Sequence, residues 1–314
     1  MPVTNNPIAP EPQKVELYEE PVETSQAAVG DAPVDVSSSA EDRVHGLSAA
    51  ELNDPNSINV TVSDKEAPLV ILFGPPACGK TMTLVRMTRF LQAEGYIVAP
   101  IRHFRPSTDT NYAYICNHFD EMMNSNNAAK STDRISFMLV EVIKNGHRIC
   151  QILEAPGEYY FDPNNPAAAF PNYVNTIISS SNRKIWTIMI EPDWMDNPDR
   201  ANYVSRINLL KRNMRPRDRV LFVYNKIDKT SFVRSVGNIN TSAAIKEVKN
   251  QYPNIFVPFM NQNPITRFFK EYNCDFVPFQ TGSYTEAVNG LTYQEGPREY
   301  CVKMWKCIKN QISG

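Results

Sequence analysis

One glycine-containing segment, Gly74–Thr81, constrains the fold of this chain more than any other part of its sequence. It has the form G-x-x-x-x-G-K-T and follows the apolar run Ala67–Phe73. Leu84, Met87 and Leu91 come after it at near-helical spacing. A loop between a buried strand and a helix can point its backbone N–H groups, and the positive end of the helix dipole, at phosphate oxygens. The segment therefore predicts a nucleotide phosphate site in an α/β domain.

The residue types of this loop suggest their roles. Lys80 is expected to reach the β- and γ-phosphates, and the Thr81 hydroxyl to ligate Mg²⁺. Nucleotide contacts are expected along the loop and the start of the helix, from Gly74, Pro75, Ala77, Cys78, Gly79, Lys80, Thr81 and Met82. The motif itself does not say which base is bound.

A second motif addresses the base. Asn225, Lys226 and Asp228 form the pattern N-K-x-D directly after the apolar run Val220–Tyr224, and open α/β sheets bind ligands at the carboxyl ends of their strands. A carboxylate at Asp228 can accept hydrogen bonds from N1–H and the N2 amino group of guanine, a pair of donors that adenine lacks. The Lys226 stem can lie along the purine, and the Asn225 amide can bond to both base and loop. The motif predicts a guanine site.

The rest of the chain alternates between strand-like and helix-like segments. Two apolar runs, 135–144 and His147–Glu154, are separated by Asn145-Gly146, a strong hairpin signal. Further strands are expected at 96–104, 184–191, 219–225 and 275–280, and helices at 80–93, 112–123, 172–180, 199–214, 243–251 and 298–312. This order predicts a layered α/β domain with a mostly parallel sheet and one antiparallel hairpin.

The two motifs, in this order, resemble those of the Ras-like (TRAFAC) P-loop GTPases over roughly residues 67–314. The resemblance implies a three-layer P-loop NTPase fold and GTP, GDP and Mg²⁺ as ligands. It also implies that Thr281 and Gly282, after the last strand, contact the edge of the base.

The resemblance implies switch residues as well. Glu154 and Gly157 stand where the family has Asp-x-x-Gly, so Glu154 would contact Mg²⁺ and the Gly157 N–H would bind the γ-phosphate. Glu158 takes a position where Ras-like members often carry a Gln that orients the attacking water. A carboxylate there would repel the γ-phosphate, so slow or partner-dependent hydrolysis is expected from a catalytic set of Lys80, Gly157 and Glu158. Thr132 is the first-switch residue expected at the metal, and Thr108 and Thr110 compete for that role.

The charge is unevenly distributed. Residues 1–66 hold 13 acidic and 3 basic side chains, whereas residues 67–314 hold 21 acidic and 29 basic ones. The first segment is poor in aromatic residues and cannot bury enough surface to offset about 1–2 kcal/mol of backbone entropy per residue. We therefore expect a disordered acidic tail, 1–66, before a GTPase-like domain, 67–314. Scattered cysteines and the lack of a secretory or membrane segment indicate a cytoplasmic protein.

These features favour a GTP-hydrolysing switch that acts on a protein partner, with nucleic acid not expected as a ligand and the oligomeric state left open. Two alternatives remain. One is a nucleotide-binding scaffold with little or no hydrolysis, suggested by Glu154 and Glu158. The other is a relative of the signal-recognition GTPases, whose loop and following helix and strand look like 79–84 and 91–98. A central parallel strand at 96–104 would favour that relative, whereas the expected hairpin disfavours it.

Overall fold

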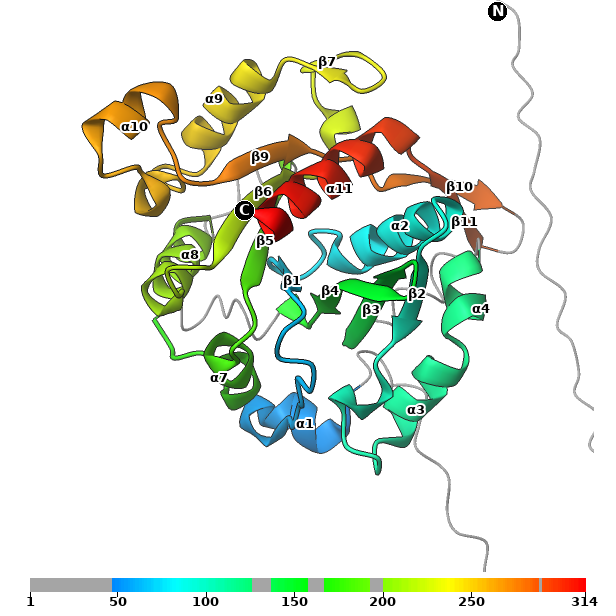
Figure 1. Ribbon diagram of the computed structural model, residues 1–314. Helices are drawn as coiled ribbons and strands as arrows, with labels where there is room; N and C mark the ends of the chain where they lie inside the picture. Colours follow the sequence, from blue (N-terminus) through cyan, green and yellow to red (C-terminus); the bar gives the residue numbers. More distant parts are fainter. Residues whose placement is uncertain (1–46, 126–136, 158–166, 193–199, 288–289) are drawn as a thin grey trace, which may run out of the picture. The chain divides into compact units, whose positions relative to one another are not determined.

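The computed structural model describes residues 47–125, 137–157, 167–192, 200–287 and 290–314. Its centre is a seven-stranded sheet of order β2-β3-β4-β1-β5-β6-β9 (Figure 1). The strands are β1 (Leu69–Phe73), β2 (Ile97–Pro100), β3 (Met138–Lys144), β4 (His147–Glu154), β5 (Lys184–Ile190), β6 (Arg219–Tyr224) and β9 (Asp275–Pro278). Neighbouring strands from β4 to β9 are parallel, and β3 is antiparallel to both of its neighbours. The expected mostly parallel sheet with an antiparallel hairpin is confirmed.

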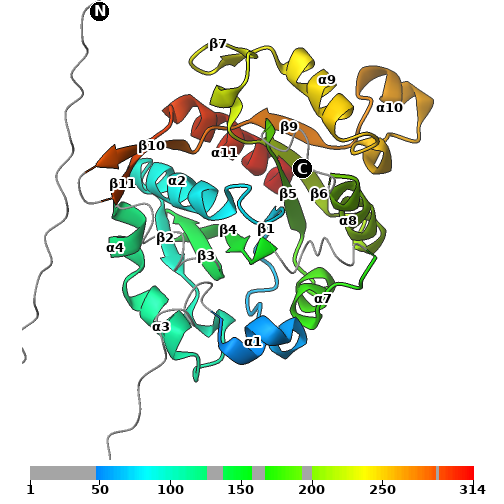
Figure 2. The ribbon, with the colours of Figure 1, turned by 180° about the vertical axis from the view of Figure 1, so that it is seen from behind.

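Helices flank this sheet, and small hairpins lie outside it. The α-helices are α1 (Ala49–Asn53), α2 (Lys80–Ala93), α3 (Thr110–Asn117), α4 (Phe119–Asn124), α7 (Asn172–Ser179), α8 (Arg200–Asn213), α9 (Thr241–Gln251), α10 (Pro264–Phe269) and α11 (Arg298–Ser313). The two-stranded sheets are β7 (Val233–Ser235) with β8 (Asn238–Ile239), and β10 (Gly282–Ala287) with β11 (Gly290–Glu295). Figures 1 and 2 show α2 and α11 side by side against the sheet, and the two helices contact each other.

The central strands form where the sequence is mostly apolar. Every residue of β1 and of β5 is buried, as parallel strands covered on both faces require. Phe73 of β1 packs edge-on to Trp186 of β5 and stacks on Tyr203 of α8, with ring centroids 6.1 and 6.2 Å apart. The β3–β4 turn places Asn145 at φ 52° and Gly146 at φ 76°, the positive values that a two-residue hairpin turn needs.

Residues 47–66 correct the expected domain boundary. The sequence places them in the tail, but Leu47, Ile58 and Val62 are buried, and α1 is capped by a reciprocal pair of hydrogen bonds between Ser48 and Glu51. A five-residue helix held by a cap and a few scattered apolar side chains has no periodicity for the sequence to show. The folded part therefore includes these residues, and the remainder of the expected tail, 1–46, lies outside the described residues.

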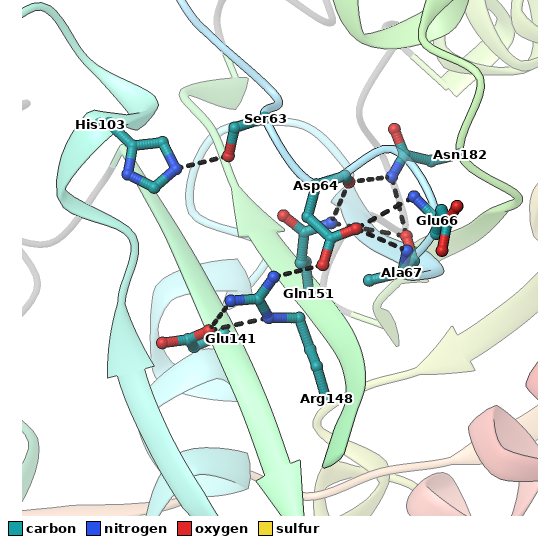
Figure 3. A network of polar contacts seen from close by, with 9 residues as sticks. All are labelled: Ser63, Asp64, Glu66, Ala67, His103, Glu141, Arg148, Gln151 and Asn182. Carbon is teal, nitrogen blue, oxygen red and sulfur yellow. Dashed lines mark hydrogen bonds and ion pairs between the residues drawn. The ribbon is translucent and has the colours of Figure 1, made fainter. Parts of the chain in front are cut away.

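The segment that leads into β1 is tied to the sheet by polar contacts (Figure 3). The Asp64 carbonyl accepts hydrogen bonds from Gln151 Nε2 at 3.0 Å and Asn182 Nδ2 at 2.6 Å. Its carboxylate pairs with Arg148 of β4, which also pairs with Glu141 of β3. These contacts fix the start of β1 between β4 and β5, and so fix where the phosphate loop begins.

Replacing Glu51 with Ala tests this boundary. Arg105 is buried and pairs with Glu51 at 2.5 Å and Asp109 at 2.8 Å. Removing one carboxylate leaves a buried guanidinium partly uncompensated, so we expect a loss of about 2 kcal/mol in the free energy of unfolding. Urea denaturation measures it, with Glu66→Ala, an exposed acid of the same segment, as the control. An unchanged midpoint would contradict the inclusion of α1 in the folded domain.

Two further segments differ from expectation. The helix expected at 112–123 is divided at His118 into α3 and α4. Of the strand expected at 96–104, only β2 forms, and the chain continues as a 3₁₀ turn, Arg102–Phe104. Because β2 lies at the edge of the sheet and pairs antiparallel with β3, the central parallel strand of the signal-recognition alternative is absent at this position. The β10–β11 hairpin, the β7–β8 hairpin and α10 were not predicted from the sequence.

Candidate nucleotide-binding site

The phosphate loop joins β1 to α2, and its backbone curls through left-handed conformations at Ala77 (φ 59°) and Gly79 (φ 90°). A Cβ on Gly74 would lie 2.6 Å from Cys78 Sγ and 3.0 Å from Met189 Cβ. Gly74 is therefore required by close packing, and Gly79 by its backbone angle. Both glycines of the motif have a structural reason in this loop.

Lys80 and Cys78 are both buried in the loop, but only Lys80 carries a charge. Lys80, 5% exposed, begins α2, and its Nζ donates to the Pro75 carbonyl at 2.8 Å. The Cys78 side chain is buried, and burial raises the pKa of its thiol to about 11. That thiol stays protonated at neutral pH and packs as a small apolar group. Lys80 is charged and lines a cavity beside the loop, where it can meet an anion.

Two side-chain oxygens, one of Thr81 and one of Glu154, lie next to each other beside the phosphate loop. Leu72 pairs with Glu154 in the β1–β4 register, so the end of β4 lies beside the start of the phosphate loop. The Thr81 hydroxyl donates to Glu154 Oε1 at 3.1 Å, and Glu154 is buried. No group of three or more His, Cys, Asp or Glu side chains that could hold a metal occurs within the described ranges. Two hard oxygen ligands fit Mg²⁺, which keeps several waters and takes phosphate oxygens in such sites.

Gly157 is pressed against the phosphate loop. A Cβ at this position would lie 2.5 Å from Pro75 C and from Pro76 N, and 2.6 Å from Lys80 Nζ. Only glycine lets the segment after β4 approach the loop this closely. The structure thus brings Gly157 and Glu154 next to Lys80, which is more than 70 residues away in the sequence.

Asn225 connects the two sequence motifs. It follows β6 and is fully buried, and its Nδ2 donates to the Cys78 carbonyl at 3.1 Å. A Cβ on Gly79 would lie 2.4 Å from the same nitrogen. The next residue, Lys226, has φ 52° and forms a 2.5 Å ion pair with the buried Glu191 at the end of β5. Phosphate loop and base motif are therefore one unit.

Asp228 lies on the exposed side of the short turn Ile227–Lys229. The turn is anchored because Ile227 is buried and its N–H donates to the Phe279 carbonyl at 3.1 Å, just after β9. The carboxylate is therefore held on a fixed turn yet open to solvent.

A cavity of about 360 Å³ lies beside the phosphate loop and the base motif, a size suited to a small ligand. Its lining consists of Pro76, Ala77, Gly79, Lys80, Thr81, Met82, Glu154, Pro156, Gly157, Asn225, Lys226, Thr281 and Tyr284. The expected site residues that do not line it are Gly74, Pro75, Cys78, Asp228 and Gly282. Thr132 and Glu158 lie outside the described residues. The chain has an α/β P-loop fold.

Four residues at or beside this cavity were missed by the sequence reasoning: Pro76, Pro156, Glu191 and Tyr284. Glu191 had no signal, because its role depends on a neighbouring strand. For Tyr284 a signal was present: Asn289-Gly290 precedes the alternating stretch Leu291–Gln294, a hairpin pattern of the kind used for β3–β4.

Comparison with family models and with curated proteins finds no match for this chain. Among solved structures, it is similar to nucleolar GTP-binding protein 1 of Plasmodium falciparum at 14% identity and a TM-score of 0.38, over 80% of this chain and 91% of that one. The GTP-bound Ski7 GTPase-like domain of S. cerevisiae gives 12% and 0.41, over 79% of this chain and 51% of that one. A signal recognition particle receptor SRb-GTP/SRX complex from Chaetomium thermophilum gives 11% and 0.36, over 78% and 98%.

No helix in the described part of the chain has both the length and the apolar character needed to cross a membrane.

Proposed function

We propose that this protein binds GTP and GDP with Mg²⁺ and works as a GTP-hydrolysing switch toward a protein partner. The observation that carries the proposal is the hydrogen bond from Asn225 to the Cys78 carbonyl. It joins the base motif to the phosphate loop, so that the motifs form walls of a single cavity that also contains Thr81 and Glu154.

Each part of the cavity suits one part of a guanine nucleotide. Lys80 and the N-terminus of α2 would hold the β- and γ-phosphates. Thr81 and Glu154 would hold Mg²⁺, which neutralises phosphate charge when bound. Thr281 and Gly282 would contact the base edge, with Asp228 accepting from the guanine N1–H and N2 amino groups. The side chain of Asp228 can turn toward a base at the mouth of the cavity, because it is exposed on its turn.

Equilibrium titration of labelled GTP, GDP and ATP tests this proposal. We expect both guanine nucleotides to bind at least about tenfold more tightly than ATP, because adenine would leave the Asp228 carboxylate without its two donors. Equal affinity for ATP and GTP would contradict the proposed role of Asp228 in recognising guanine.

Turnover is proposed to be slow or dependent on a partner, because Glu158 stands where a neutral water-orienting side chain would serve better. Glu154 favours a second candidate, a nucleotide-binding scaffold, because Mg²⁺ demands near-ideal octahedral geometry and this carboxylate has one methylene more than Asp. Single-turnover release of phosphate separates the two. Release that no partner accelerates would favour the scaffold.

Gly157→Ala is expected to separate GTP from GDP binding. Its methyl group would meet Lys80 Nζ and the Pro75–Pro76 backbone, so the Gly157 N–H would be displaced from the γ-phosphate. Loss of one charge-assisted hydrogen bond predicts about a tenfold drop in GTP affinity with a smaller change for GDP. The ratio of the two dissociation constants is the measurement. Gly314→Ala, where a Cβ would make only ordinary contact with the Asn310 carbonyl oxygen at 3.4 Å, is the control, and an unaltered ratio in Gly157→Ala would argue against the γ-phosphate role.

The cytoplasm is the proposed location. All six cysteines are free thiols, a state that a reducing compartment maintains, and cytoplasmic GTP would be available to the cavity.

A further inference from the structure

The β10–β11 hairpin is built onto the base end of the nucleotide cavity. It begins immediately after Thr281, and Tyr284 of β10 lines the cavity together with Lys226 and Thr281. Tyr284 pairs with Tyr293 of β11 in the strand register, with ring centroids 5.7 Å apart. The Tyr284 ring therefore lies at the end of the cavity where we propose that the purine binds.

The root of this hairpin has little freedom. A Cβ on Gly282 would lie 2.2 Å from the Gln294 carbonyl oxygen and 2.7 Å from Tyr293 Cε2. The Thr281 carbonyl accepts from Tyr293 Oη at 2.6 Å and from the Gly296 N–H at 3.0 Å. The loop proposed to touch the base edge and the hairpin are thus a single packed unit, so the position of Tyr284 is set relative to that loop.

A charged latch ties the same hairpin to α2, and we define it as Arg86, Arg89 and Glu295. Arg86, only 4% exposed, binds Glu295 Oε2 at 2.5 Å through Nη1 and the Gly296 carbonyl at 2.7 Å through Nη2. Arg89 reaches Glu295 Oε1 at 3.3 Å and lies 5.4 Å from the Tyr293 ring centroid. The helix that starts at Lys80 therefore also holds the hairpin.

Apolar packing supports the latch. Met82, on the first turn of α2, and Tyr293 form a buried cluster of their own beside the cavity. The hairpin is consequently joined to the phosphate-binding end of α2 by a charged contact and an apolar one, and to the base loop by hydrogen bonds.

We infer that this hairpin is a wall of the nucleotide site that slows nucleotide release: Tyr284 packs against the bound purine, and the Arg86–Arg89–Glu295 latch holds it there. The inference rests on the proposed function and adds a residue and a regulatory contact to it. Tyr284 is 44% exposed, which leaves ring surface for a base to cover, and base–aromatic stacking accounts for a substantial part of affinity in nucleic-acid sites. Lys226 lines the same cavity, so its side-chain stem offers a second surface to the same base.

Release of GDP from the full chain tests the inference. The protein is loaded with GDP carrying a fluorescent N-methylanthraniloyl group on the ribose and chased with excess unlabelled GDP. Tyr284→Ala is expected to release it about tenfold faster, whereas Tyr284→Phe should release it at nearly the wild-type rate, because the ring rather than the hydroxyl makes the contact. Tyr114→Ala, at a tyrosine of α3 with 47% exposure, is the matched control and should not alter the rate.

The latch is tested by a double-mutant cycle. Glu295→Gln should accelerate release several-fold in the wild-type background and add nothing in the Tyr284→Ala background, because Glu295 acts through Tyr284. The Gln side chain keeps an oxygen that can accept from the buried Arg86, which also retains its hydrogen bond to the Gly296 carbonyl, and a thermal melt of the variant checks that it folds. Tyr284→Leu serves as a second variant without a ring in case Tyr284→Ala does not fold.

The outcomes separate the inference from the proposed function. If the wild-type protein binds no guanine nucleotide, both fall. If it selects guanine but the two ring-less variants release GDP at the wild-type rate, the wall is overturned and the proposed function stands. Independent, multiplicative effects of Tyr284→Ala and Glu295→Gln would overturn the role of the latch.

Discussion

Replacing Asp228 with Asn is expected to lower the affinity for GTP by about 100-fold, which corresponds to about 2.7 kcal/mol. The carboxylate is proposed to accept two hydrogen bonds from guanine, and each bond to a charged group contributes about 1.5–3 kcal/mol. An amide can accept only one of them and presents its NH₂ group to the N2 amino group of the base. Competition binding against labelled GDP measures the loss.

The same variant should gain affinity for xanthosine triphosphate, because xanthine carries a carbonyl where guanine carries the N2 amino group. The side-chain NH₂ group that Asp228→Asn introduces would then meet an acceptor. Asp120→Asn, the same chemical change at an exposed site on α4, controls for the change in net charge and should leave both affinities unchanged. Loss of GTP binding with no gain for xanthosine triphosphate would mean that Asp228 supports the fold of the turn and does not read the base.

Replacing Lys80 with Met is expected to abolish most phosphate binding, with a drop in GTP affinity of about 100-fold or more. The ammonium is nearly buried and donates a hydrogen bond to the Pro75 carbonyl. Met has a similar length and no charge, so the unliganded protein should keep its thermal stability or gain slightly. A thermal melt with and without GTP and Mg²⁺ shows both effects, because a ligand that binds the native state raises Tm.

Lys309→Met, an exposed lysine on α11, is the control for this experiment and should retain the full GTP-dependent rise in Tm. The opposite pattern for Lys80→Met, a low melting temperature without nucleotide and an intact rise with it, would show that Lys80 is a structural residue of the loop.

Much of the central sheet is readable from the sequence. β1 is an uninterrupted apolar run and β5 and β6 are mostly apolar, and Asn145-Gly146 marks a turn whose positive φ angles few other residue pairs adopt. Such signals are local, because a strand buried on both faces or a two-residue turn restricts each residue by itself. The β10–β11 hairpin was not predicted, because its strands are short and their apolar side chains are few or alternate with polar ones.

The candidate site likewise has one part that the sequence indicates and another that only the tertiary structure shows. The chemistry expected of the phosphate loop and of the base motif follows from residue types alone, because G-x-x-x-x-G-K-T and N-K-x-D each require particular residues at fixed spacing. Three other features became visible only in the folded chain: Asn225 fastens to the Cys78 carbonyl, Glu191 pairs with Lys226, and Tyr284 borders the cavity. Those contacts depend on which strands are neighbours and how far a hairpin folds back, and these follow from the packing of the whole sheet and its helices.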